Sequence, residues 1–220
     1  VCANSVPKAV AIIADVCDFL DEPNIKKLFG DWRLGLETDQ QVLKKFGFRG
    51  RNIIIAAGTV ESVRGLNVKH QRPDVMLFDD IQSRQDAESQ VISEQIETDM
   101  IGTAMKAKSP HGCLFLFIGN MYPTKWSILR RLKSNPTWVK FIAGGIIQDE
   151  NGQPRSLWED LQPLTQLLKE FENDSASGRA EVFYAEVLND ENAAVSNICD
   201  INRIPQNPFA LDPQHQGNFI

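Results

Sequence analysis

The chain has 220 residues, 42% of them hydrophobic, which is typical of a globular protein with one large domain or two small ones. Its net charge of −6 argues against nucleic-acid binding through overall charge, so a DNA partner would need a local basic surface. No stretch approaches the about 20 apolar residues of a membrane span, and four scattered cysteines without a CxxC pair argue against structural zinc.

The first part of the chain alternates between predicted strands and helices. Residues 1–4 have the pattern of a strand end, and apolar residues at helical spacing predict a helix over 5–20. A short helix over 25–29 is followed by a polar connection. The apolar run 52–58 predicts a buried strand closed by glycine, and 59–73 predicts a loop with a short helix.

The same alternation continues through the middle of the chain. An uninterrupted apolar run predicts a strand over 74–79 that is covered on both faces, and one apolar stripe predicts a long helix over 85–105. A second strand covered on both faces is expected over 112–118. A basic helix over 125–133 and a strand over 138–144 are expected to follow it. The basic helix is a candidate DNA surface, although a solvated helix face has the same composition.

The pattern changes in the last part of the chain. Residues 158–188 predict helices without strands between them, and 196–220 are rich in Asn, Pro and Gln, which is typical of a linker. Alternating strands and helices indicate an α/β fold with an open, mostly parallel sheet flanked by helices. We expect strands 52–58, 74–79 and 112–118 in that sheet, with the C-terminal helices forming an extension outside it.

Two strand ends carry polar side chains. Asp79 and Asp80 follow the strand 74–79, and Asn120 follows the strand 112–118. In open α/β sheets, ligands bind beyond the carboxyl ends of the strands. A buried strand that ends in two acidic residues is the Walker B arrangement of nucleotide hydrolases, in which the first carboxylate holds Mg²⁺ and the second orients the attacking water. A strand that ends in Asp for turn or cap reasons has the same pattern.

Short motifs follow one another along the chain in a distinctive order. They are "ANSVPKA" at 3–9, "SVRG" at 62–65, "VMLFDD" at 75–80, "FIGN" at 117–120 and a helical tail with Trp158, Phe183 and Glu186. In this order they resemble the ATPase domain of the large terminase subunit of tailed bacteriophages, the motor that packages DNA. The resemblance spans most of residues 1–195.

The resemblance implies a RecA-like P-loop ATPase core over 1–150, a helical extension over 151–195 and a linker over 196–220 toward a nuclease domain. ATP and Mg²⁺ are the implied cofactors: Asp79 would bind the metal, Asp80 would position water, and Asn120 would contact the nucleotide and couple loss of its γ-phosphate to movement. The implied partners are double-stranded DNA, a portal protein, a small terminase subunit and further copies in a ring. The implied location is the host cytoplasm, at the portal vertex of a procapsid.

The sequence departs from the family pattern at three points. No G-x-x-x-x-G-K-[ST] phosphate loop occurs, and by the family pattern it would precede Val1, so we expect the chain to be a fragment that binds ATP weakly or not at all. Asp80 stands where the family usually has Glu. Ile118 replaces a small hydroxyl residue in the coupling motif, which leaves Asn120 as its candidate sensor.

Arg64 of "SVRG" is a candidate phosphate-contacting catalytic residue, although a solvated loop arginine is the common alternative. A superfamily 2 helicase orders similar motifs along one sheet but needs a second, similar α/β domain. A docking module with the same fold and no hydrolysis is the second rival, suggested by the missing phosphate loop.

Overall fold

The computed structural model describes residues 1–47, 51–58 and 71–190. The chain divides after Gly119 into a first unit, Val1–Gly119, and a second unit, Asn120–Ile220. Parallel strands flanked by helices make up much of the first unit, so the expected α/β class is confirmed. The described residues contain no helix that is both long and apolar enough to cross a membrane.

The first unit is built on a four-stranded parallel sheet in the order β5-β1-β6-β7. The strands are β1 (Cys2–Ala3), β5 (Ala57–Gly58), β6 (Val75–Asp79) and β7 (Leu114–Ile118). The strands predicted over 74–79 and 112–118 are therefore confirmed, and they are parallel neighbours in this sheet. Asp79 pairs with Ala3 on one side and with Ile118 on the other, which places it at the carboxyl edge of the sheet.

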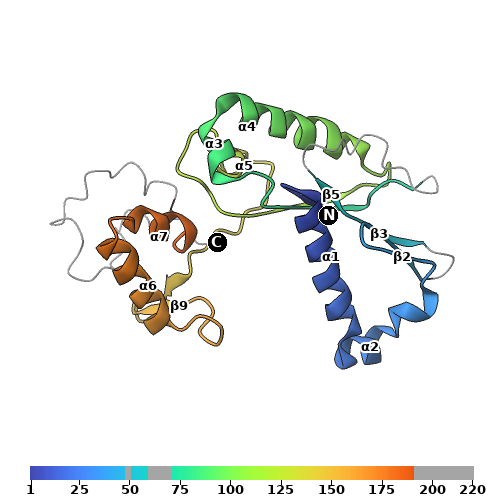
Figure 1. Cartoon of the computed structure of the whole chain (residues 1–220), viewed down its shortest axis with the longest axis horizontal. Coiled ribbons are helices and arrows are strands. Elements are labelled where there is room, and N and C mark those ends of the chain that lie inside the picture. Colours follow the sequence, from blue (N-terminus) through green and yellow to red (C-terminus); the bar gives the residue numbers. More distant parts are fainter. Residues whose placement is uncertain (48–50, 59–70, 191–220) are drawn as a thin grey trace. The chain divides into compact units, whose positions relative to one another are not determined.

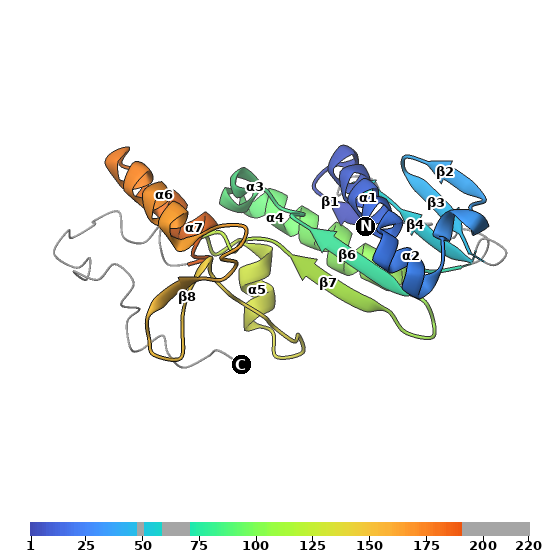
Figure 2. The same cartoon turned by 90° about the horizontal axis from the view of Figure 1, so that it is seen from below.

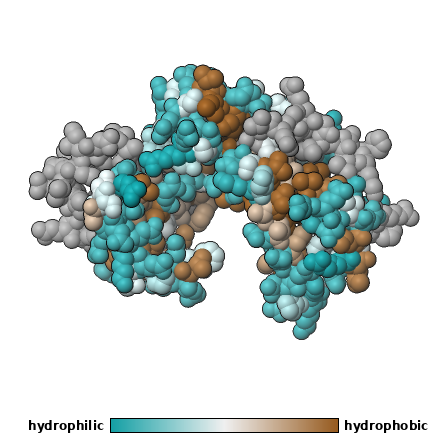
Figure 3. All heavy atoms as spheres, in the orientation of Figure 1, coloured by the Kyte–Doolittle hydropathy of each residue, from teal (hydrophilic) through white to brown (hydrophobic). Residues whose placement is uncertain are grey.

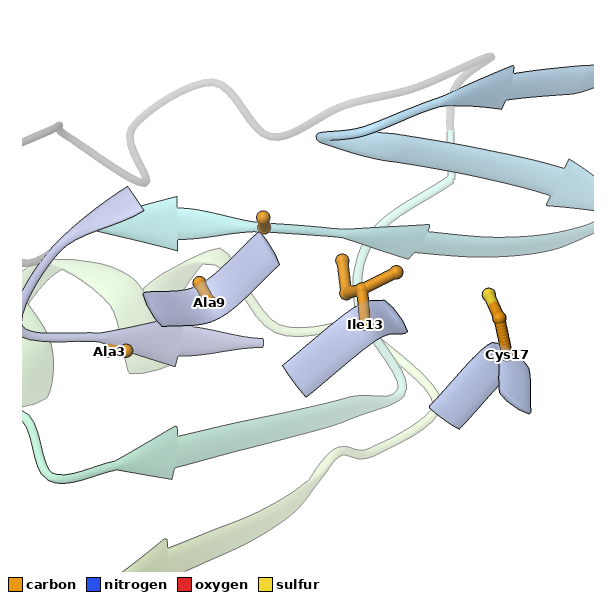
Figure 4. Close-up of a cluster of buried hydrophobic side chains, with 5 residues drawn as sticks. Ala3, Ala9, Ile13 and Cys17 are labelled. Atoms are coloured by element: carbon orange, nitrogen blue, oxygen red, sulfur yellow. The ribbon is translucent and has the colours of Figure 1, made fainter. Parts of the chain in front are cut away.

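Helix α1 (Val6–Asp21), close to the predicted helix over 5–20, lies on one face of this sheet, against β1 and β5. Pro7 lies in its first turn, where proline is tolerated, and Pro23 disfavours helical backbone at the preceding Glu22. The helix packs its small and apolar side chains against β1 and against Ala56, just before β5 (Figure 4). The buried cluster consists of Ala3, Ala9, Ile13, Cys17 and Ala56.

The opposite face of the sheet is covered by a helical segment that is not one continuous helix (Figures 1 and 2). Its parts are α3 (Arg84–Glu88), α4 (Gln90–Glu97), a π-helical turn (Thr98–Thr103) and a 3₁₀ turn (Ala104–Ala107). The predicted single helix over 85–105 is wrong at Ser89, which has extended backbone and accepts a 3.4 Å hydrogen bond from the Ile92 amide. Serine favours such a cap over a helix interior.

A second, antiparallel sheet was not predicted. It consists of β2 (Thr38–Gln40), β3 (Leu43–Phe46) and β4 (Asn52–Ile55). The expectation that 52–58 forms one strand of the parallel sheet is therefore wrong for its first half, because β4 pairs with β3 and only β5 joins the parallel sheet. The polar connection after the short helix contains β2 and β3.

Charged side chains fix the far end of α1 to the segment that follows it. Helix α2 (Pro23–Phe29) and a 3₁₀ turn (Trp32–Gly35) come after α1. Asp21, the last residue of α1, accepts hydrogen bonds from the Trp32 indole and the Arg33 guanidinium, and pairs with Lys26 at 2.9 Å. These donors, Arg33 foremost, hold the pKa of the Asp21 carboxyl well below its usual range.

The second unit combines helices with a two-stranded antiparallel sheet. Its elements are α5 (Ile128–Ser134), β8 (Ile146–Gln148), β9 (Pro154–Ser156), α6 (Leu164–Ala176) and α7 (Ala180–Glu186). The predicted helices over 158–188 are confirmed from Leu164 onward. The predicted strand over 138–144 is wrong: Val139 and Phe141 are exposed, and the strand begins at Ile146.

The α1 side of β6 and β7 exposes apolar side chains. Strand residues alternate between the two faces, and Ala3 and Asp79 are paired, so Asp79 and its alternate neighbours lie on the α1 face. The exposed apolar side chains on this face are Val75, Leu114, Leu116 and Ile118. In Figure 2, α1 lies over β1 and not over β6 or β7. A second exposed apolar area lies where α4 begins (Figure 3), at Val91 and Ile92.

This alternation gives a matched pair of substitutions in β7. Phe117 stacks on the fully buried Phe78 with ring centroids 4.4 Å apart, whereas the adjacent Leu116 is on the exposed face. We expect Phe117→Leu to lower the free energy of unfolding by about 1 kcal/mol, because it removes the ring stack. Leu116→Thr should change it by less than about 0.5 kcal/mol. Urea unfolding of both variants measures the difference, and equal losses would contradict the assignment of faces.

Candidate functional site

Asp79 lies at the carboxyl end of a central strand of the parallel sheet. Its neighbours in the sheet are Ala3, two residues before the cap of α1, and Ile118, two residues before Asn120. The side chain is half-buried on the same face as α1. The fold therefore brings the start of α1 and the end of β6 to one edge of the sheet, where open α/β folds bind their ligands.

The electrostatic environment of Asp79 disfavours its charge. Partial burial raises the pKa of the Asp79 carboxyl above its ordinary value, and the adjacent Asp80 charge raises it further. Lys8, in the first turns of α1, acts in the opposite direction. A divalent cation at this carboxylate would offset both unfavourable effects.

Asp80 has an unusual backbone conformation. Its φ is +42°, in the left-handed region that Asp and Asn tolerate better than other residues with a side chain. Its amide donates to the Ile118 carbonyl at 3.1 Å, so the contact between β6 and β7 continues for one residue beyond β6. The side chain is exposed, unlike that of Asp79. The turn gives the two adjacent carboxylates different environments.

Because the backbone of Asp80 is left-handed, glycine at this position should stabilise the fold, whereas glycine ordinarily destabilises it. We expect Asp80→Gly to raise the free energy of unfolding by up to about 1 kcal/mol, because glycine adopts positive φ without a Cβ clash. Asp74, just before β6, has an ordinary negative φ and is the control: Asp74→Gly should lower stability by about 0.5–1 kcal/mol. Chemical denaturation measures the free energy of unfolding of both variants. A lower value for Asp80→Gly than for the wild type would contradict the left-handed backbone of Asp80.

Buried polar side chains anchor the segment after Asp80. Ile81 and Gln82 are buried, and the Gln82 amide donates to the Ser93 hydroxyl at 2.8 Å. Ser93 in turn donates to the Asp86 carbonyl at 3.0 Å. Ser83 and Asp86 form a capping box at the start of α3. This network was not predicted, although the spacing of Ser83 and Asp86 is a capping-box signal.

Asn120 begins the second unit and contacts its last described helix. Gly119 has φ +151°, a conformation that favours glycine, at the exit from β7. The Asn120 amide nitrogen donates to the Glu186 carboxylate at 2.7 Å. This contact was not predicted, because the sequence pattern holds no signal that joins residues 66 positions apart.

Arg64 lies outside the described residues. Within residues 1–47, 51–58 and 71–190, no group of three or more His, Cys, Asp or Glu side chains is placed to hold a metal ion. Mg²⁺ bound together with a nucleotide takes one or two carboxylates and phosphate oxygens, so the half-buried Asp79 carboxylate fits that mode.

The arrangement offers a half-buried carboxylate suited to a cation and an exposed carboxylate on a left-handed turn beside it. These two groups have the chemistry needed to hold a metal–phosphate ligand and to accept a proton from water. Comparison of the chain with protein-family models, with curated proteins and with solved structures finds no match.

Proposed function

We propose that this chain is the core of a Mg²⁺-dependent ATPase that drives double-stranded DNA into a viral procapsid, as the resemblance to terminase large subunits implies. One observation supports this proposal above the others: a central parallel strand, β6, ends in two carboxylates of different environment at the edge where α1 begins. An ordinary turn or cap does not need a half-buried carboxylate whose charge its surroundings disfavour.

The proposal gives the carboxylates separate roles. Bound Mg²⁺–ATP would supply the electrophilic γ-phosphate and neutralise its charge. Asp79 is the proposed ligand of that metal because it is half-buried and disfavoured as a lone anion. Asp80, exposed one residue later, is the proposed acceptor for a proton of the attacking water. Asn120 is the proposed sensor of the γ-phosphate, and Arg64 a proposed phosphate contact.

The described part of the second unit bears on the helicase alternative. A helicase of superfamily 2 pairs its first α/β domain with a second one of similar fold. Residues 120–190 hold helices and a two-stranded antiparallel sheet, without parallel strands. Helices α6 and α7 lie within the expected helical extension over 151–195, and the proposal therefore favours the packaging motor and its ring, portal and small-subunit partners.

An ATPase assay on the full-length gene product tests the proposed function. Purified protein should hydrolyse ATP only with Mg²⁺, and added double-stranded DNA should raise the rate. Asp15→Asn, on the exposed side of α1, is a matched control that should leave the rate unchanged. A full-length product that binds no nucleotide and hydrolyses none would favour the docking module, and hydrolysis stimulated only by single strands would favour a helicase.

A further inference from the structure

Two successive residues beyond β7 are hydrogen-bonded to the last residue of α7 and to the segment that follows it. The Asn120 amide nitrogen donates to Glu186 Oε2 at 2.7 Å, and the Met121 backbone amide donates to Asn189 Oδ1 at 3.0 Å. Met121 is buried, so this segment is packed as well as hydrogen-bonded. Both contacts lie within the second unit.

The end of α7 is a firmly held support for these contacts. Phe183 and Ala185 are each only 1% exposed, and Phe183 packs edge-to-face on Phe171 of α6 at 5.2 Å. The Val187 carbonyl accepts a 2.6 Å hydrogen bond from the Gly145 amide. Glu186, between these anchored positions, therefore presents its carboxylate from a fixed backbone.

The contact determines which atom of Asn120 remains available as an acceptor. A carboxylate only accepts hydrogen bonds, so the amide nitrogen of Asn120 must face Glu186, and its Oδ1 points away. The negative charge of Glu186 also disfavours a direct contact between Asn120 and an anionic phosphate oxygen. A water molecule can donate a hydrogen bond to Oδ1 and carries no charge for Glu186 to repel.

We propose that Glu186 is a positioning residue for Asn120. It holds the amide so that Oδ1 is presented as a hydrogen-bond acceptor, and Asn120 senses the γ-phosphate through a water molecule next to it. This inference rests on the proposed ATPase function and names a residue and an atom that the resemblance does not assign. It also ties the sensor to α7, the helix whose C-terminal end carries Glu186.

The contact itself is tested without nucleotide, in the 220-residue chain, by NMR of the Asn120 side-chain amide. Glu186→Gln should shift its signals, because the substitution removes the negative charge to which this amide donates. Glu181→Gln, on the same helix, is the matched control and should leave these signals unchanged. Asn120 signals indifferent to Glu186→Gln would overturn the proposal.

The role is tested by ATPase kinetics on the full-length gene product. Glu186→Gln should lower kcat about tenfold with little change in KM for ATP, because a glutamine can also donate and no longer fixes the amide. Asn120→Asp should be worse, since two carboxylates would face each other. The exchanged pair Asn120→Asp with Glu186→Gln should regain about tenfold over Asn120→Asp, because the glutamine can donate to the new carboxylate.

The outcomes separate the two proposals. If the parent protein hydrolyses ATP and Glu186→Gln has the parental kcat, the positioning role is wrong while the ATPase function stands. If the exchanged pair stays as inactive as Asn120→Asp, the acceptor role of Asn120 Oδ1 is wrong. If the parent hydrolyses no ATP, the proposed function and the role of Glu186 in it both fail, whatever the NMR response.

Discussion

Asp80→Asn should leave ATP binding nearly intact and lower the turnover of the full-length gene product by about 10²-fold or more. The substitution removes only the capacity to accept a proton. Asparagine has nearly the same shape, and it tolerates the φ of +42° as well as aspartate does, so the strand end keeps its backbone. Steady-state ATPase rates and calorimetric ATP titrations measure the two quantities separately.

Asp80→Glu is the companion variant, because glutamate is the usual residue of the resembled family. It should retain activity but lower the free energy of unfolding, since glutamate lacks the short polar side chain that stabilises left-handed backbone. Turnover of Asp80→Asn at the parental rate would mean that the carboxylate is structural. Glu88 of α3 and Glu94 of α4, on the segments that follow, would then be the next candidates for the base.

The elements that the sequence predicted well are those whose apolar pattern has one explanation. Helix α1 buries Ala9, Ile13 and Cys17, and the three- and four-residue spacing of the apolar residues in this segment is that of a helix face. The runs that became β6 and β7 form strands as expected, but the expectation that both strands are covered on both faces is wrong, because their α1 face is exposed. Position along the chain was enough to place Asp79 at the carboxyl end of its strand.

Partner choice and local polar competition could not be predicted in the same way. The run from Asn52 to Gly58 has the composition of one strand, and nothing in it says that β4 pairs with β3 while β5 pairs with β1. The break at Ser89 depends on a side-chain cap competing with the helix. The contact between Asn120 and Glu186 depends on the packing of the second unit, which a single sequence does not encode as a local pattern.

Asp79→Asn should affect stability and activity in opposite directions. Burial and the Asp80 charge raise the pKa of Asp79, so the folded chain binds this proton more tightly than the unfolded chain. The stability that this protonation contributes is fully present below the ordinary carboxyl pKa of about 3.9 and is lost as the pH rises through the raised value. At neutral pH without metal, the wild-type chain carries this unfavourable charge, and Asp79→Asn removes it.

Thermal unfolding of the chain therefore gives Asp79→Asn a higher Tm than the wild type at neutral pH, and the difference shrinks as the pH falls toward about 3.9. Adding Mg²⁺ should raise the Tm of the wild type and not of the variant, because only the carboxylate binds the cation. In the full-length gene product, the same variant should lose turnover by at least about 10²-fold, together with Mg²⁺-dependent nucleotide binding. Asp15→Asn should change none of these. If Asp79 is functional, it is retained although its charge lowers the stability of the fold. An Asp79→Asn variant that is both less stable and fully active would therefore contradict the metal-binding role of Asp79.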